Sequence, residues 1–182
     1  MQPDADELDA RTRTGPAVAA STTLIITSAT FIPWPRAYDG HVGREARVSP
    51  PVRVERKRVA VMFACASEDT PAAIQRAWAE FERVVGLKGR KFFGAFDSGT
   101  HEYRVCARLE KDDDPTALGL DVGTLPGGIY LRARLQGEPP AVYEKIPSVF
   151  GDLVKEAAVD SSRPTIEFYR SRTVIDLLLP IS

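Results

Sequence analysis

The pattern of apolar and polar positions occurs in two copies along the last two thirds of this 182-residue chain. In the first copy, the apolar run 59–66 predicts a buried strand, and 71–85 has apolar residues at helical spacing. Thr70 and Pro71 are typical of a helix start, and Gly86 of a helix end. Strand patterns follow at 91–96 and 101–110, joined by the turn "DSGT". The predicted order is strand, helix, strand, strand.

The same order returns after the acidic linker "EKDDDP". A strand is expected at 127–135, a helix within 138–158 that Pro147 should kink or delay, and two strands at 164–169 and 173–181. Two copies of one supersecondary unit usually form a single molecule with a pseudo-twofold axis. The sequence therefore predicts an α+β fold of two related strand-helix-strand-strand modules, with mainly antiparallel sheets and a groove between them.

The first 48 residues differ in composition, being rich in Thr, Ala, Pro and Arg after an acidic start. We expect residues 1–48 to be a partly disordered extension, in which "TLIIT" at 23–27 is the candidate for an added edge strand. Residues 49–182 are expected to form one domain, with module 1 at about 51–110 and module 2 at about 120–182.

Composition narrows the classes of partner. The 24 basic and 25 acidic residues leave a formal net charge of −1, which argues against direct nucleic-acid binding, and no helix-turn-helix pattern precedes the domain. No segment approaches the roughly 20 apolar residues of a membrane span, so a cytoplasmic protein is expected. The two cysteines, Cys65 and Cys106, lie in apolar segments and are interpreted as buried free thiols, with a disulfide bridge between them as the alternative. Two distant histidines without a cysteine cluster predict no metal site, and no cofactor motif is present.

An acid in an apolar strand is the main chemical clue. In "PTIEFY", Ile166 and Phe168 share one face, while Glu167 and Tyr169 share the other. We expect the first pair to face the helix-packed core and Glu167 to face the groove; a solvent-exposed carboxylate is the alternative. Partial desolvation by aromatic rings would raise the pKa of Glu167, which suits a general acid/base or a partner for a cation.

Further candidates for ligand contact come from the same alternation. Tyr130 and Arg132 are expected on the groove side, where Arg132 or Arg104 would pair with Glu167 or bind an anionic group of the ligand; solvated surface charge is the alternative. The remaining candidates are aromatic, with ordinary core packing as the competing interpretation: Phe63, Trp78, Phe96, Tyr103 and Tyr143.

Several segments together resemble the GyrI-like small-molecule-binding domains, which include the effector domains of drug-responsive AraC- and MerR-type regulators. The resemblance covers about residues 50–182 and lies in "PPVRVERKRVAVMFA", "IQRAWAEF", "FFGAFDSGTHEYRVCARLE", "LPGGIYLRARLQG", "FGDLV", "PTIEFY" and "VIDLLLPI". It implies a ligand groove between two modules, with Glu167 projecting into it. In the drug-sensing members the matching acid contacts cationic, lipophilic ligands. In some stand-alone relatives a glutamate does the acid/base work of hydrolases that open cyclopropane rings.

The sequence thus predicts a stand-alone protein that binds a lipophilic or amphipathic xenobiotic, with Glu167 as the polar anchor of an aromatic groove and no cofactor. The alternative is a hydrolase of lipophilic electrophiles, in which Glu167 is the general acid/base and Tyr130 or Tyr169 orients the substrate. The pattern of residues leaves the identity of the ligand and the oligomeric state open.

Overall fold

The computed structural model describes residues 45–182, so the expected strand at 23–27 lies outside the described residues. Each module has the predicted order of elements. Module 1 consists of β3 (Val59–Cys65), α1 (Pro71–Val85), β4 (Phe92–Asp97) and β5 (Glu102–Arg108). Module 2 consists of β7 (Gly128–Gln136), α2 (Ala141–Glu144), α3 (Ile146–Glu156), β8 (Thr165–Ser171) and β9 (Val174–Pro180). Three further strands lie outside the predicted strand-helix-strand-strand order: β1 (Arg47–Val48), β2 (Val52–Arg56) and β6 (Asp121–Leu125).

All the strands belong to one sheet, whose order shows the internal symmetry. The order is β1-β7-β9-β8-β4-β5-β3-β6, and β2 also pairs with β7. Within it, β7-β9-β8 mirrors β3-β5-β4, and the modules meet where β8 pairs antiparallel with β4. The α+β class and the pseudo-twofold arrangement are therefore confirmed.

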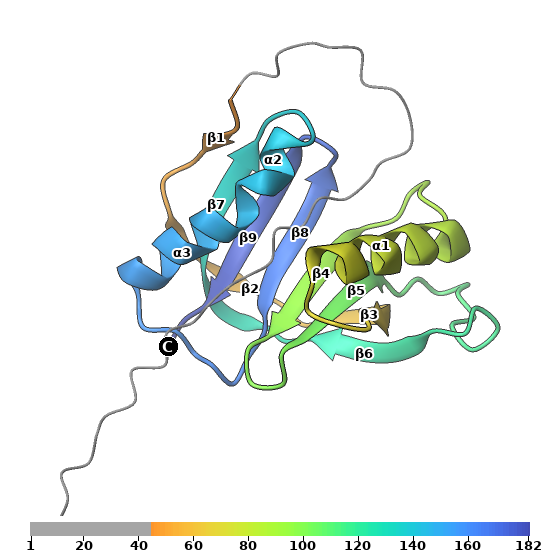
Figure 1. Cartoon of the computed structure of the whole chain (residues 1–182). Helices are drawn as coiled ribbons and strands as arrows, with labels where there is room; N and C mark the ends of the chain where they lie inside the picture. Colours follow the sequence, from red (N-terminus) through yellow and green to blue (C-terminus); the bar gives the residue numbers. More distant parts are fainter. Residues whose placement is uncertain (1–44) are drawn as a thin grey trace, which may run out of the picture.

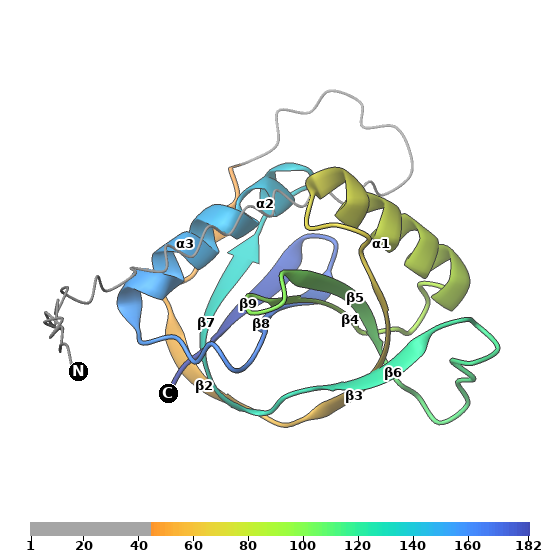
Figure 2. The same ribbon diagram turned by 60° about the horizontal axis from the view of Figure 1, so that its bottom comes forward.

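Two long connections join the far ends of the modules. β2 leads directly into β3, and β6 leads into β7. The two connections then pair with each other antiparallel, β2 with β7 and β3 with β6. Because the paired segments connect the outer strands of the two modules, the sheet curls round on itself (Figures 1 and 2). The helices lie on the outer face of this curl, α1 over module 1 and α2 and α3 over module 2 (Figure 2).

The local signals in the sequence explain where the helices begin and end. The Thr70 side chain accepts a hydrogen bond from the amide of Ala73 at 3.3 Å, and Gly86 ends α1 with a φ of 75° that favours glycine. The second helix is divided, because α2 ends at Glu144 and Pro147 lies in the first turn of α3. The expected effect of Pro147 is confirmed.

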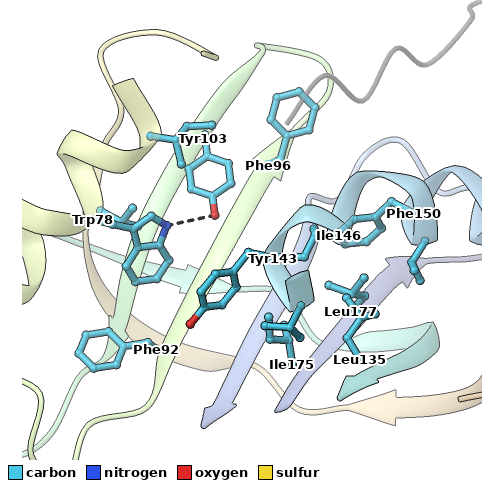
Figure 3. Packing of buried hydrophobic residues seen from close by; sticks show 14 of the residues in the cluster. Trp78, Phe92, Phe96, Tyr103, Leu135, Tyr143, Ile146, Phe150, Ile175 and Leu177 are labelled. Atoms are coloured by element: carbon cyan, nitrogen blue, oxygen red, sulfur yellow. Dashed lines mark hydrogen bonds between the residues drawn. The ribbon is translucent and has the colours of Figure 1, made fainter. Parts of the chain in front are cut away.

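The sheet has an apolar cluster on each face. The larger one fills the space between the sheet and the helices, with Trp78, Tyr143 and Phe150 among its members (Figure 3). The smaller one lies inside the curl and includes Val61, Phe93, Ala95, Cys106, Leu125, Tyr130, Ile166 and Leu178. Cys106 and Cys65 are free, but only Cys106 is buried. The expectation of two buried thiols is wrong for Cys65, because that residue ends β3 at the margin of the sheet.

None of the helices between residues 45 and 182 has the length and apolar character needed to cross a membrane.

Candidate functional site

The orientation of β8 differs from the one expected. Ile166 belongs to the cluster inside the curl and Phe168 packs against it, whereas Tyr169 packs against the cluster under the helices. The assignment of Ile166 and Phe168 to the helix-packed face is therefore wrong. The alternation along β8 correctly placed Ile166 and Phe168 on one face and Glu167 and Tyr169 on the other. Because apolar side chains cover both faces of the strand, apolar character could not show which face meets the helices.

Glu167 lies at the centre of a buried hydrogen-bond cluster on the helix face. Its side chain is 5% exposed, and its Oε2 accepts hydrogen bonds from the hydroxyls of Tyr103 at 2.8 Å and Tyr169 at 2.5 Å. The indole Nε1 of Trp78 donates to the Tyr103 hydroxyl at 3.3 Å (Figure 3). One carboxyl group thus links α1, β5 and β8, and the alternative of a solvent-exposed carboxylate is excluded.

Gly94 makes room for this cluster. It pairs with Glu167 across the β4–β8 ladder and with Val105 across the β4–β5 ladder. A Cβ atom at Gly94 would lie 2.2 Å from the Tyr103 hydroxyl oxygen and 2.7 Å from Glu167 Oε2. No side chain larger than hydrogen fits there without displacing the cluster, so this glycine is required for close approach rather than for backbone conformation.

Burial raises the pKa of the three ionisable groups of this cluster, Glu167, Tyr103 and Tyr169. Desolvation raises the pKa of Glu167, and the hydrogen bonds from Tyr169 and Tyr103 oppose that rise without cancelling it. Desolvation, reinforced by the nearby charge of Glu167, raises the pKa of Tyr103 and Tyr169 well above the usual value for tyrosine. Both hydroxyls therefore remain hydrogen-bond donors, and the carboxyl group ionises less readily than it would in water.

A pocket of about 330 Å³ opens next to this cluster, between α1 and α2. Its walls are largely aromatic: the ring centroids of Trp78 and Tyr169 are 5.1 Å apart in an edge-to-face arrangement, and those of Tyr143 and Tyr169 are 6.4 Å apart. Glu167 lies behind Tyr169 and does not line the pocket itself. The lining residues are Trp78, Glu82, Leu87, Arg90, Phe92, Tyr143, Tyr169, Arg170, Ser171 and Arg172.

Glu82 is the acidic residue of the pocket lining that the sequence analysis missed. It is half-buried in the wall of the pocket, and desolvation raises its pKa to about 7, although the nearby charge of Arg172 acts in the opposite direction. The available signal was its position four residues after Trp78, because residues at that spacing lie on the same side of a helix. A carboxyl group with a pKa near neutrality can change its charge when a ligand binds.

The predicted site residues divide between the two faces of the sheet. Trp78, Tyr103, Tyr143 and Tyr169 are brought together around Glu167 and the pocket. Phe96 is on the same face but packs edge-on to His101, with ring centroids 6.2 Å apart, and does not line the pocket.

Tyr130, Arg132 and Phe63 lie on the opposite face. The Tyr130 hydroxyl donates to the carbonyl of Pro126 at 2.9 Å, and Tyr130 is buried inside the curl. Phe63 packs against the same cluster, with the guanidinium of Arg104 5.1 Å from the centre of its ring. Arg132 alternates with Leu131 and Ala133, which face the helices. The expected pairing of Arg132 or Arg104 with Glu167 is therefore wrong, because the sheet separates them.

Within residues 45–182 there is no group of three or more His, Cys, Asp or Glu side chains placed to hold a metal ion.

Comparisons with known proteins extend this description at the level of the fold. Neither protein-family models nor curated proteins match the sequence. Among solved structures, an integron cassette protein from the mobile metagenome of Vibrio cholerae matches with a TM-score of 0.55 and 16% identity, over 76% of this chain and 100% of that one. SAV2435, solved bound to tetraphenylphosphonium, matches with a TM-score of 0.54 and 16% identity, over 74% of this chain and 94% of that one.

A third similar structure is a protein of Staphylococcus aureus described as a candidate bacterial transcription regulation protein. It matches with a TM-score of 0.51 and 15% identity, over 73% of this chain and 98% of that one. At these identities the likeness establishes a shared fold, which extends over nearly the whole of each of these three proteins.

Proposed function

We propose that this chain is a GyrI-like small-molecule-binding protein that holds a lipophilic cation in the pocket between α1 and α2. The observation that carries the proposal is the buried carboxyl of Glu167 directly behind the aromatic wall, joined to it by the 2.5 Å hydrogen bond from Tyr169. The volume of about 330 Å³ lies within the range of pockets that bind small organic ligands. SAV2435, which shares the fold, binds the lipophilic cation tetraphenylphosphonium.

Electrostatics explain the preference for a cation. A hydroxyl that donates to a carboxylate makes its aromatic ring a better partner for positive charge, and a cation beside the ring favours the ionised carboxylate. Glu167 would thus act on the ligand through Tyr169, as a positioning residue. Glu82, with its pKa of about 7, would provide a second negative charge in the wall of the pocket.

Two of the three arginines in the wall, Arg90 and Arg170, are paired with aspartates that do not line the pocket. Arg90 forms two hydrogen bonds with the carboxylate of Asp113, at 2.7 and 2.6 Å, and Arg170 forms an ion pair with Asp176. Asp113 offsets the charge of Arg90, whereas Asp176 is shared between Arg170 and Arg134. The third arginine, Arg172, lies close enough to Glu82 to favour its ionised form. The aromatic rings and Glu82 thus form the part of the binding surface that suits a lipophilic cation, with Glu167 behind Tyr169.

Calorimetric titration with tetraphenylphosphonium tests the proposal. The wild-type protein should bind it, and Glu167→Gln, which keeps the size of the side chain, should weaken binding about tenfold because the carboxylate behind the aromatic wall is lost. Equal affinity in the wild type and Glu167→Gln would refute the role of Glu167. No binding to the wild type would refute the ligand class.

The pH dependence of tetraphenylphosphonium binding distinguishes the contribution of Glu82 from that of Glu167. Binding should strengthen between pH 6 and 8, because Glu82 ionises over that interval. Glu82→Gln should remove the increase. The matched control is Glu80→Gln on the same helix, since Glu80 is exposed, pairs with Arg83 and does not line the pocket. An increase that persists in Glu82→Gln would contradict this assignment.

A hydrolase is the second candidate, and the pKa of Glu82 favours it. A group with a pKa of about 7 that lines the pocket suits general acid/base catalysis better than Glu167, which is buried behind Tyr169. Incubation with cyclopropanoid and related electrophiles should then show turnover that is lost in Glu82→Gln. Binding of these compounds without turnover would reject the enzymatic function.

A further inference from the structure

A second and larger pocket, of about 760 Å³, lies where the β2–β3 junction passes over the ends of three other strands. Its lining comes from the junction at 56–60, from the residues at 90–93 where β4 begins, from the end of β5 at 108–109, and from 168–170 in β8. It adjoins the pocket between the helices, with which it shares Arg90, Tyr169 and Arg170. The volume is within the range of small-ligand sites.

The charge of this pocket is entirely positive. None of its thirteen lining residues is acidic, and the basic ones are Arg56, Lys57, Arg58, Arg90, Lys91, Arg108 and Arg170. Arg90 and Arg170 are paired with aspartates, and Arg108 lies 3.5 Å from Glu110. The other four basic residues form no ion pair with any residue between 45 and 182. They are Arg56, Lys57, Arg58 and Lys91. Four uncompensated cations around one concavity produce a positive potential that favours a multiply charged anion.

The floor of the pocket is aromatic. Phe93 and Phe168 are stacked, with ring centroids 4.9 Å apart and an angle of 17° between the planes. The guanidinium groups of Arg56 and Arg170 lie 5.5 and 5.1 Å from the centre of the Phe168 ring. Aromatic carbon and positive charge thus lie side by side, which is the combination that binds a ring carrying anionic groups.

We infer that this pocket binds a small molecule that combines a planar ring with two or more phosphate or sulfate groups, as a nucleoside triphosphate does. The ring would pack against Phe168, and the anionic groups would lie among Arg56, Lys57, Arg58 and Lys91, which offer charge-assisted hydrogen bonds. A concavity of about 760 Å³ with an aromatic floor matches the size of a small ligand better than the extended backbone of a nucleic acid. The inference does not depend on the ligand of the pocket between the helices.

Calorimetry at low ionic strength with ATP, pyrophosphate and adenosine tests the inference, because these probes separate the ring from the charge. ATP should bind at least about tenfold more tightly than pyrophosphate or adenosine, since only ATP makes both kinds of contact. The double variant Lys57→Glu/Arg58→Glu changes two exposed side chains and should weaken ATP binding by at least about tenfold. Phe168→Leu should weaken ATP binding and leave pyrophosphate binding unchanged.

The matched control is Arg47→Glu/Arg76→Glu, which makes the same change in net charge at exposed positions outside the pocket. It should retain the affinity of the wild type for ATP. An equal loss in both double variants would overturn the inference, because the effect would then come from overall charge. Pyrophosphate binding as tightly as ATP, or a single-stranded oligonucleotide binding more tightly than ATP, would overturn it as well.

Discussion

Replacing Gly94 with alanine tests whether the buried cluster around Glu167 is as tightly packed as the geometry indicates. The new Cβ would lie 2.2 Å from the Tyr103 hydroxyl oxygen. That oxygen would have to move by roughly 0.8 Å to reach even a 3.0 Å contact, and Tyr103 is fully buried. A shift of this size away from Gly94 would disturb the 2.8 Å hydrogen bond from Tyr103 to Glu167.

Two destabilising effects and one stabilising effect determine how far Gly94→Ala changes the free energy of unfolding. Overpacking in a close-packed interior costs about 1–3 kcal/mol, and weakening a hydrogen bond to a buried carboxyl group costs about 1–3 kcal/mol. Alanine restores about 0.5–1 kcal/mol by reducing the conformational entropy of the unfolded chain. We therefore expect Gly94→Ala to lower the free energy of unfolding by about 1–5 kcal/mol.

Urea denaturation measures this change, because a shift of the midpoint at constant slope reports a change in stability. Gly151→Ala in α3 is the matched control, since a Cβ there meets nothing within 4 Å and alanine should stabilise the helix by about 1 kcal/mol. In a Tyr103→Phe background, which removes the nearest oxygen, Gly94→Ala should be less damaging. A Gly94→Ala variant within about 0.5 kcal/mol of the wild type would show that the cluster is not closely packed.

Three further outcomes are expected. Burial raises the pKa of Glu82 from its ordinary value of 4.5 to about 7, so the folded state holds this proton more tightly, and stability should fall as pH rises between these values. Urea midpoints at pH 5 and pH 8 should show that Glu82→Gln reduces this fall. Asp176 is 1% exposed and forms ion pairs with two arginines; Asp176→Asn should cost about 2–3 kcal/mol, whereas the exposed Asp152→Asn should cost less than about 0.5 kcal/mol. Similar losses in the two variants would contradict this. Thr70→Ala removes the helix cap and should cost about 1 kcal/mol in the same assay; an unchanged midpoint would mean that the cap contributes nothing.

Local signals in the sequence predicted the elements of both modules and their order. The apolar periods predicted both helices and the strands of both modules, the cap at Thr70 and the break near Pro147 are in their predicted places, and the repeated order predicted the pseudo-twofold sheet. These features depend on residues within a few positions of one another, and such interactions are visible in the sequence alone. β6 was missed because its five residues, "DVGTL", include only two large apolar side chains.

The face and surroundings of Glu167 were decided by tertiary structure. Alternation placed Glu167 opposite Ile166 and Phe168, but two apolar clusters cover the two faces of β8, so the pattern could not show which face meets the helices. The partners of Glu167 were equally inaccessible, because Tyr103 is 64 residues away in sequence, and only the pairing of β4 with both β5 and β8 brings the two together.

The basic pocket shows the same division between local and long-range information. The overall charge of −1 gives no indication of it, since the acidic residues are distributed over other parts of the chain. The curl of the sheet places the junction at 56–58 against basic residues from β5, from β8 and from the segment before β4. The sequence therefore determined the elements that make up the two predicted modules and which side chains share a face. The long-range pairing of strands decided which faces and charges meet, because that pairing depends on contacts between distant residues.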